Sequence, residues 1–298
     1  MLKEGRVFMV CNLCPRQCGA LRTGTAGAGH CRMPDSPVVA RAALHHWEEP
    51  PLSGTNGSGT VFFSGCALDC VFCQNEQISH RDYGKAVTIA RLREICEELA
   101  AQGAHNINFV NPTHYAHVVA RVLERPLPVP VVWNSGGYDR VETLRALRGK
   151  VDVYLPDLKY IRPDTALRYS GAEDYPRAAL AAIQEMAAQT GPVQLERGLI
   201  RRGVIIRHLL LPGQGDQARA VMDWVSDAFR PGEVLFSLMS QYTPWGGARQ
   251  LPPLDRALRR SEARAAAEYM ENVGLAGFVQ ERDSAGEDYT PAFDLTGI

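Results

Sequence analysis

The chain has little net charge, no long apolar run and no apolar N-terminal segment. Its 298 residues carry a formal net charge of −1, so no overall electrostatic attraction draws it to nucleic acid or to an acidic membrane surface. No apolar stretch approaches the roughly 20 residues that span a bilayer. The first ten residues lack the apolar core of a signal peptide. We therefore expect a cytoplasmic monomer with no nucleic-acid or membrane partner.

Cysteine is present in number but unevenly distributed. Seven of the eight cysteines fall within the first 73 residues, and Cys96 stands alone. In a reducing compartment, closely spaced cysteines predict metal ligands rather than disulfides. Cys96 lies on the apolar stripe of a predicted helix, so we expect it to be a core residue.

The composition divides the chain into two parts. Residues 1–58 are rich in Cys, Gly and Pro and contain one predicted strand, at 37–43, and a flexible connector is expected at 53–59. Residues 59–298 alternate short apolar strands with helices, which is typical of a parallel sheet covered on both faces. The strands are expected at 60–64, 106–111, 129–135, 151–158, 204–211 and 233–240, with a weaker one at 277–281. This pattern predicts an α/β fold, barrel-type or doubly wound, after a small cysteine-rich metal module.

Four helix starts are suggested by local signals. Thr88 is expected to cap a helix that carries an apolar stripe. Asp139 and Glu142 have the spacing of a capping box. Asp216 and Ser261 are expected to begin two further helices.

The most informative segment is the loop after the first strand of the second part. It places Cys66, Cys70 and Cys73 at a C-x3-C-x2-C spacing, with Phe72 directly before the last cysteine. Thiolates are the soft ligands of iron–sulfur clusters, and three of them leave one iron of a cubic cluster open for a substrate or cofactor. The alternatives are a zinc site, which with four thiolates usually uses paired C-x2-C units, or buried structural cysteines.

Polar residues end several of the predicted strands. In barrel enzymes the chemistry gathers at the C-terminal ends of the strands, so we expect these side chains to share one mouth of the sheet. For Asp157 and Lys159 the alternative is an ion pair that only closes a strand, and for His114 a proton shuttle and the first turn of a helix are equally good readings. The residues at these ends are Asn111, Thr113, His114, Asn134, Ser135, Asp157, Lys159, Arg207, His208 and Gln241.

The chain resembles the radical S-adenosylmethionine (SAM) superfamily, and within it the proteins similar to pyruvate formate-lyase activating enzyme. The resemblance is carried by the three-cysteine loop and by the segments at 46–50 and 57–66. It implies a partial (β/α)6 TIM-type barrel over 59–298, a [4Fe–4S] cluster on the three cysteines, and SAM bound at the open iron. Reductive cleavage of SAM would then give a 5′-deoxyadenosyl radical that abstracts hydrogen from a substrate.

The resemblance also implies which residues contact SAM. Asp157 and Lys159 are similar to an Asp-Leu-Lys segment near the methionyl group, and Arg207 to an arginine that could bind a carboxylate through two parallel hydrogen bonds. The family's Gly-Gly-Glu after the second strand is replaced at 110–114 by Val-Asn-Pro-Thr-His, which offers neutral oxygens but no carboxylate. The implied cofactor-binding residues are Phe72, Asn111, Thr113, Asn134, Ser135, Asp157, Lys159, Arg207 and Gln241.

A second candidate metal set is formed by Cys11, Cys14, Cys18 and Cys31, which we call the N-terminal thiol set. Four thiolates can close a metal shell, so we expect a structural or electron-relaying centre rather than a second catalytic one. Zinc and a second [4Fe–4S] cluster both fit, and free thiols are the third alternative. Arg16, inside the set, could offset thiolate charge.

The preferred function is hydrogen abstraction from a protein or peptide substrate, in the manner of a glycyl-radical activase, with electrons from a flavodoxin- or ferredoxin-type donor. A second hypothesis is a small-metabolite substrate. A third, a non-catalytic electron carrier with two closed clusters, is disfavoured because the three-cysteine loop has no fourth ligand nearby. Glu48 or Glu49 could hydrogen-bond the site or form a solvated acidic turn, and the polar residues 280–291 could cover the open side of the barrel.

Overall fold

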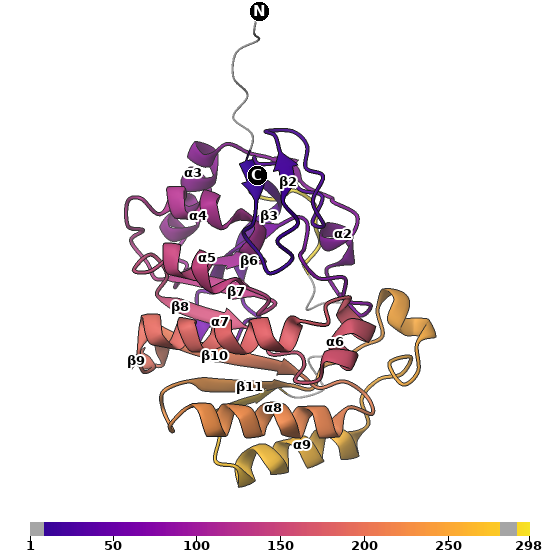
Figure 1. Cartoon of the computed structure of the whole chain (residues 1–298). Coiled ribbons are helices and arrows are strands. Elements are labelled where there is room, and N and C mark those ends of the chain that lie inside the picture. Colours follow the sequence, from indigo (N-terminus) through magenta and orange to yellow (C-terminus); the bar gives the residue numbers. More distant parts are fainter. Residues whose placement is uncertain (1–8, 281–290) are drawn as a thin grey trace, which may run out of the picture.

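The structure, a computed structural model, describes residues 9–280 and 291–298 (Figure 1). Its central feature is a ten-stranded sheet with the order β12-β11-β10-β8-β7-β6-β4-β3-β5, in which β9 pairs with β10. Each neighbouring pair from β4 to β12 is parallel. Within the described residues β5 and β12 are opposite ends of this order and do not pair, so the sheet is an open, partial barrel. The strands are β3 (Val38–His45), β4 (Ser58–Phe63), β5 (Lys85–Ala86), β6 (Ile107–Val110), β7 (Val131–Ser135), β8 (Val153–Pro156), β9 (Gln194–Glu196), β10 (Leu199–Leu209), β11 (Leu235–Met239) and β12 (Gly277–Gln280).

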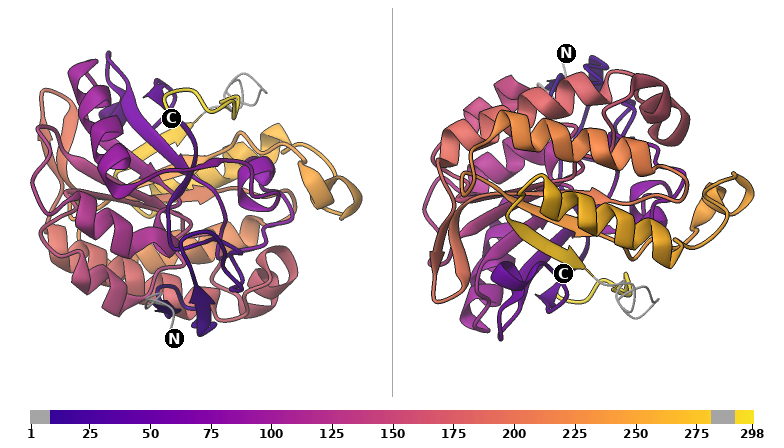
Figure 2. Two further views of the ribbon diagram at one scale, coloured as in Figure 1. Left: turned by 90° about the horizontal axis from the view of Figure 1, so that it is seen from above. Right: turned by 90° about the horizontal axis from the view of Figure 1, so that it is seen from below.

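Helices connect the parallel strands and pack beside one another along the sheet (Figures 1 and 2). In α3 the Thr88 side chain accepts a hydrogen bond from the backbone N–H of Arg91, which confirms the predicted cap. The apolar stripe of α3 is buried, and Cys96 is a fully buried core residue as predicted. The helices are α1 (Pro50–Ser53), α2 (Glu76–Ser79), α3 (Ile89–Ala101), α4 (Ala116–Val122), α5 (Val141–Ala146), α6 (Pro163–Ser170), α7 (Tyr175–Thr190), α8 (Gly215–Ala228) and α9 (Arg260–Asn272), with 3-10 turns η1 (Thr113–Tyr115) and η2 (Gly246–Gln250).

The predicted parallel strands are all present, and those from β4 to β11 are largely buried, whereas β12 at the edge of the sheet is half exposed. β4 shows why: all six of its residues are buried, because β3 and β6 flank it and helices and loops cover its faces. A strand buried on both faces carries apolar or small residues without alternation. Asp216 and Ser261 lie within the first turns of α8 and α9, so both of those predicted starts are correct to one residue.

The capping box at Asp139 and Glu142 is wrong. Helix α5 begins after Arg140 with no side-chain cap. The Asp139 carboxylate is 1% exposed and instead accepts hydrogen bonds from Thr113 Oγ1 (2.6 Å) and Trp133 Nε1 (3.3 Å), as well as from the Ser135 hydroxyl. The Asp139 carboxylate therefore accepts hydrogen bonds from buried donors at neighbouring strand ends instead of capping α5.

The N-terminal part is joined to the main sheet. The strand predicted at 37–43 is β3, which pairs antiparallel with β4 across the predicted boundary at residue 58. The connector expected at 53–59 is shorter than predicted: an exposed turn at 54–56 joins α1 to β4, and the flanking Ser53 and Ser58 are buried. Ahead of β3, a separate two-stranded sheet pairs β1 (Met9–Cys11) with β2 (Ala20–Arg22).

Two further predictions concern the ends and surface of the chain. No helix within residues 9–280 and 291–298 is both long and apolar enough to cross a membrane. The cover expected from residues 280–291 lies mostly outside the described residues, which omit 281–290.

Candidate functional site

A cavity of about 770 Å³ lies at the C-terminal ends of the parallel strands. The carboxyl ends of such strands meet at one edge of the sheet, which is why residues distant in sequence line it together. Trp47, at the rim, is 61% exposed, so the cavity reaches the surface. The predicted site residues that line it are Cys70, Phe72, Cys73, Asn134, Asp157, Lys159, Arg207 and Gln241.

Charged side chains form one wall of the cavity, around Asp157. Its carboxylate accepts hydrogen bonds from Lys159 Nζ at 2.6 Å and from Arg207 Nε at 2.9 Å. The three side chains are about 15% exposed. Burial alone would raise the pKa of Asp157, but the two cations outweigh it and hold that pKa below its ordinary value. Asp157 is therefore a charged carboxylate between two cations, which hold it in place.

Two glutamates before α1 complete this wall. Glu48 accepts hydrogen bonds from Asn108 Nδ2 (3.1 Å) and Asn134 Nδ2 (3.3 Å), and its other oxygen lies 3.5 Å from Arg207 Nη1. Glu49 is 1% exposed, and one of its oxygens lies 4.0 Å from Arg207 Nε. Burial raises the pKa of Glu48, and it raises that of Glu49 to about 7. The acidic-turn alternative for this segment is wrong, because both carboxylates face the arginine rather than solvent.

The three-cysteine loop lines the same cavity through Cys70, Phe72 and Cys73. Each of its sulfurs has a hydrogen-bonding neighbour: the Leu68 N–H lies 3.4 Å from Cys66 Sγ, a serine hydroxyl lies 3.0 Å from Cys70 Sγ, and another lies 3.2 Å from Cys73 Sγ. The two hydroxyls belong to Ser170, at the end of α6, and Ser79, in α2. Burial raises the pKa of all three thiols, to about 11 for Cys73.

Comparison with known proteins agrees with this arrangement. A model of the radical SAM superfamily matches residues 60–225, more than half of the chain. The chain belongs to the radical SAM superfamily. An uncharacterized protein of Methanocaldococcus jannaschii is 30% identical over 280 residues, which cover 90% of this chain and 76% of that protein.

A solved structure shares the overall fold. Streptococcus suis SuiB bound to S-adenosylmethionine matches 75% of this chain with a TM-score of 0.52 and 12% identity. The matched part of the present protein corresponds to half of the length of SuiB. A domain of pyruvate-formate lyase-activating enzyme from Bacteroides vulgatus matches 65% of the chain and is 91% covered, at 11% identity. Its TM-score of 0.37 is too low to support a closer relationship.

Membership of the superfamily implies a [4Fe–4S] cluster and SAM, and the donor set of the three-cysteine loop fits them. Three thiols share one loop, each beside a potential hydrogen-bond donor, and such donors stabilise thiolates and tune clusters. Burial raises the pKa of Cys70, and the nearby Lys159 cation offsets part of that rise. Cys66, Cys70 and Cys73 would hold the cluster, and the charged wall around Asp157 lines the same cavity as Cys70 and Cys73.

Four predicted site residues do not line the cavity. Thr113 and Ser135 bond the buried Asp139 and belong to the core beneath the strand ends. Asn111 has a φ of 57° and donates from Nδ2 to the Gly65 carbonyl at 2.5 Å, so it supports the loop that begins at Gly65. The fourth, Cys66, lies on the loop itself, and its sulfur is 3.7 Å from Asn111 Oδ1.

The two strand-end histidines are core residues. His114 Nε2 lies 2.7 Å from the Ser64 carbonyl, and His208 Nδ1 lies 2.7 Å from the Leu158 carbonyl. Burial lowers the pKa of His114 to about 3 and that of His208 to about 4. Neither lines the cavity, so the structure favours the 3-10 turn reading of His114 over a proton shuttle.

Sequence reasoning missed the supports that come from distant helices. Ser170 and Ser79 beside the cluster cysteines carry no local signal. Tyr175, in α7, has no local sequence signal either. Its hydroxyl lies 2.7 Å from the Asp157 carbonyl and 2.9 Å from the Lys159 N–H. Ser170 and Tyr175 lie on α6 and α7, which pack on each other, and Ser79 lies on α2, so all three reach the site through tertiary packing.

The N-terminal thiol set is gathered in one place. Cys11, Cys14 and Cys31 are buried and Cys18 is exposed. Burial raises the pKa of Cys14 to about 12, with smaller contributions from the other three thiols. Within residues 9–280 and 291–298, no three His, Cys, Asp or Glu side chains already converge on a single ion position.

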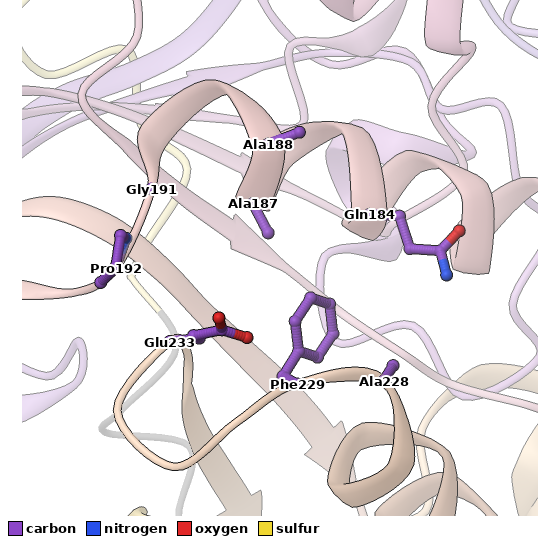
Figure 3. Close-up of a pocket in the computed structure, with 8 residues that line it drawn as sticks. All are labelled: Gln184, Ala187, Ala188, Gly191, Pro192, Ala228, Phe229 and Glu233. Atoms are coloured by element: carbon purple, nitrogen blue, oxygen red, sulfur yellow. The ribbon is translucent and has the colours of Figure 1, made fainter.

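Another pocket, of about 280 Å³, lies far from the cysteines in sequence and position, between the end of α7 and the segment that follows α8. Figure 3 shows Phe229 and Glu233 facing the alanines of α7 across it. It contains no cysteine and one charged side chain, Glu233, so it lacks the donors that the chemistry of this family requires.

Proposed function

We propose that this radical SAM enzyme abstracts a hydrogen atom from a protein or peptide segment, in the manner of glycyl-radical activases. The observation that carries the proposal is the single cavity of about 770 Å³, which joins the three-cysteine loop to a charged wall and reaches the surface at Trp47. Its size is in the upper part of the usual range for ligand pockets, about 300–1,000 Å³. Such a cavity can hold SAM and still admit an extended segment from the open side of the sheet.

The residues of the chain would bind and orient SAM. Lys159 and Arg207 present cations to a carboxylate, and Glu48 presents a carboxylate to an ammonium group. Their shared hydrogen bonds fix these charges before SAM arrives, which lowers the cost of binding. When bound, the [4Fe–4S] cluster and SAM supply the 5′-deoxyadenosyl radical typical of the family.

Support for a peptide substrate also comes from SuiB, which has the same overall fold and was solved bound to the precursor peptide SuiA, with a TM-score of 0.51 to this chain. The likeness is at 11% identity and concerns the fold. We extend it to this chain because the cavity rim is formed by large side chains that can pack on a peptide, among them His46 and Trp47.

We further propose that a flavodoxin- or ferredoxin-type donor approaches the loop from its outer side. A pocket of about 300 Å³ reaches Cys70 and Cys73 from that side and is also lined by Arg32, His80 and Gly246. The same two cysteines line the inner cavity. The loop is thus a thin wall through which an electron has a short path.

The experiment is to incubate reduced, cluster-loaded enzyme with SAM and candidate proteins, and separately with candidate metabolites. A stable glycyl radical in electron paramagnetic resonance, or a modified peptide in mass spectrometry, supports the proposal. Release of 5′-deoxyadenosine that depends on a metabolite, with no protein modified, replaces it with the small-metabolite alternative. Cys70→Ala protein is the control, because it retains the cavity but lacks one cluster ligand.

A further inference from the structure

Arg22 is a buried cation without a carboxylate partner in the described part of the chain. Its side chain is 1% exposed, and its guanidinium donates to the carbonyls of Met33 (3.1 Å), Pro34 (2.5 Å) and His114 (2.6 Å). The nearby carboxylate of Asp35 is bonded instead to a histidine, His117, at 2.8 Å. The guanidinium also lies over the Tyr115 ring, with Cζ 5.1 Å from the ring centroid. Carbonyl oxygens and an aromatic face supply only partial negative charge, so a full opposite charge would stabilise this buried cation further.

Arg22 also contacts a cysteine of the N-terminal thiol set. Arg22 Nη1 lies 3.7 Å from Cys11 Sγ. A neutral thiol contributes little, but metal binding removes the thiol proton and leaves a thiolate. With four thiolates, either a zinc ion or a [4Fe–4S]2+ core carries a net charge of about −2. Such a centre supplies the charge that the arginine lacks.

We propose that the N-terminal thiol set binds a metal centre, zinc or a [4Fe–4S] cluster, and that Arg22 offsets its negative charge. Binding forms four metal–sulfur bonds and releases the four thiol protons to solvent. This site is additional to the three-cysteine loop, and the proposal does not depend on which substrate the enzyme uses.

The backbone brings the four cysteines together. The N–H of Gly19 bonds the Cys11 carbonyl at 3.1 Å, which closes the loop between β1 and β2. A Cβ on Gly29 would lie 3.0 Å from Cys18 Sγ, so the glycine lets the 29–31 segment approach that sulfur. Among the described residues the four sulfurs do not converge on one ion position, so metal binding requires the side chains to rotate and the loop to adjust around them.

The proposed centre lies directly against the catalytic loop. Arg16 Nε donates to the Ala67 carbonyl at 2.9 Å, and His30 Nε2 lies 3.0 Å from Asp69 Oδ2. Gly65, with a φ of 79°, faces the Cys31 carbonyl, which a Cβ there would approach to 2.9 Å. Three contacts thus hold the residues on either side of Cys66, and metal binding would fix the frame on which the catalytic loop rests.

The test uses the exposed Cys18. We would treat native enzyme with iodoacetamide, with and without a chelator, and measure alkylation of each cysteine by peptide mass spectrometry. Because Cys18 is exposed, coordination rather than burial must protect it, and we expect alkylation at least about tenfold slower before chelation. Buried Cys96 is the internal control and stays protected in both samples while the protein is folded. Equal rates at Cys18 with and without chelator would overturn the proposal.

A second measurement separates this site from the catalytic cluster. The variant Cys66→Ala/Cys70→Ala/Cys73→Ala cannot hold the family cluster, so metal in it belongs to the thiol set. We expect one zinc or about four irons per chain by metal analysis, and visible absorbance after reconstitution distinguishes the two. If this variant is folded but binds no metal when zinc, or iron with sulfide, is supplied, the proposal is overturned. That result holds whether or not the intact enzyme cleaves SAM.

The role of Arg22 is tested in the same background. Arg22→Met removes the cation and should weaken metal retention against a chelator by about tenfold or more, whereas Arg22→Lys keeps the charge and should lose less. Equal retention in both folded variants would show that Arg22 does not offset the charge of the centre.

Discussion

Replacing Asp157 with Asn is the most informative change to the charged wall. The carboxylate is shared by Lys159 and Arg207 at 2.6 and 2.9 Å, and an amide of the same shape leaves two partly buried cations beside each other. Removing one partner of a buried ion pair costs about 3–5 kcal/mol. Because these side chains are about 15% exposed, we expect the lower end, about 3 kcal/mol of unfolding free energy.

The pH dependence gives a second signature of the same interaction. The folded-state pKa of Asp157 is held below its ordinary value of 3.8. The stabilisation is therefore complete above that ordinary value and is lost as the pH falls through the lower folded-state pKa. Asp157→Asn should lack this acid-side loss, while its deficit at neutral pH remains.

The assay is urea unfolding together with SAM binding by equilibrium dialysis to cluster-loaded protein. We expect weaker SAM binding in the folded fraction as well as lower stability, because the displaced cations face the cavity. Glu142→Gln, at an exposed ion pair, is the control and should change neither. Unchanged stability would refute the ion network, and reduced stability with normal SAM affinity would show that Asp157 only supports the strand end.

Three further changes test other parts of the structure. Burial raises the pKa of Glu49 to about 7 from 4.5, so the wild-type unfolding free energy should fall as the pH rises from about 4.5 to about 7, where the unfolded chain ionises this acid and the folded chain keeps it protonated. Glu49→Gln should flatten that slope in urea titrations. Gly137→Ala places a Cβ 2.0 Å from the Asp157 carbonyl at a φ of 75°, so it should lower the melting temperature strongly. The control is Gly149→Ala, which has a similar φ of 76° but open space around the Cβ and should cost only about 1 kcal/mol. Cys96→Ala removes a fully buried sulfur from the α3 stripe and should cost about 1–2 kcal/mol in urea unfolding without changing the iron or zinc content.

Much of the fold followed from local pattern. The buried parallel strands have continuous apolar sequences, and this pattern depends only on their own residues. The Thr88 cap followed for the same reason, since its partner is the Arg91 N–H three residues away. The position of Asp157, Lys159 and Arg207 at one mouth followed from the general rule that parallel strands end together.

Features that depend on tertiary neighbours could not be predicted in this way. Asp139 satisfies a capping pattern, but Trp133 and Thr113 compete for its carboxylate, and the buried donors win because an unpaired carboxylate in the core costs more than an uncapped helix. β3 joins the main sheet through pairing with β4, which composition does not reveal. The orientation of the Glu48 side chain could not be predicted from local sequence either, because its partners Asn108 and Arg207 are distant in sequence.

Cleavage of SAM to 5′-deoxyadenosine is the reaction that an iron–sulfur cluster on the three-cysteine loop would support. Anaerobically reconstituted protein is reduced with dithionite, given SAM, and analysed for 5′-deoxyadenosine by liquid chromatography and mass spectrometry. We predict 5′-deoxyadenosine from the wild type and none from Cys66→Ala, Cys70→Ala or Cys73→Ala protein, since each sulfur would hold a separate iron. Failure of cluster-loaded, reduced wild type to form 5′-deoxyadenosine, or equal formation by the cysteine variants, would contradict the account.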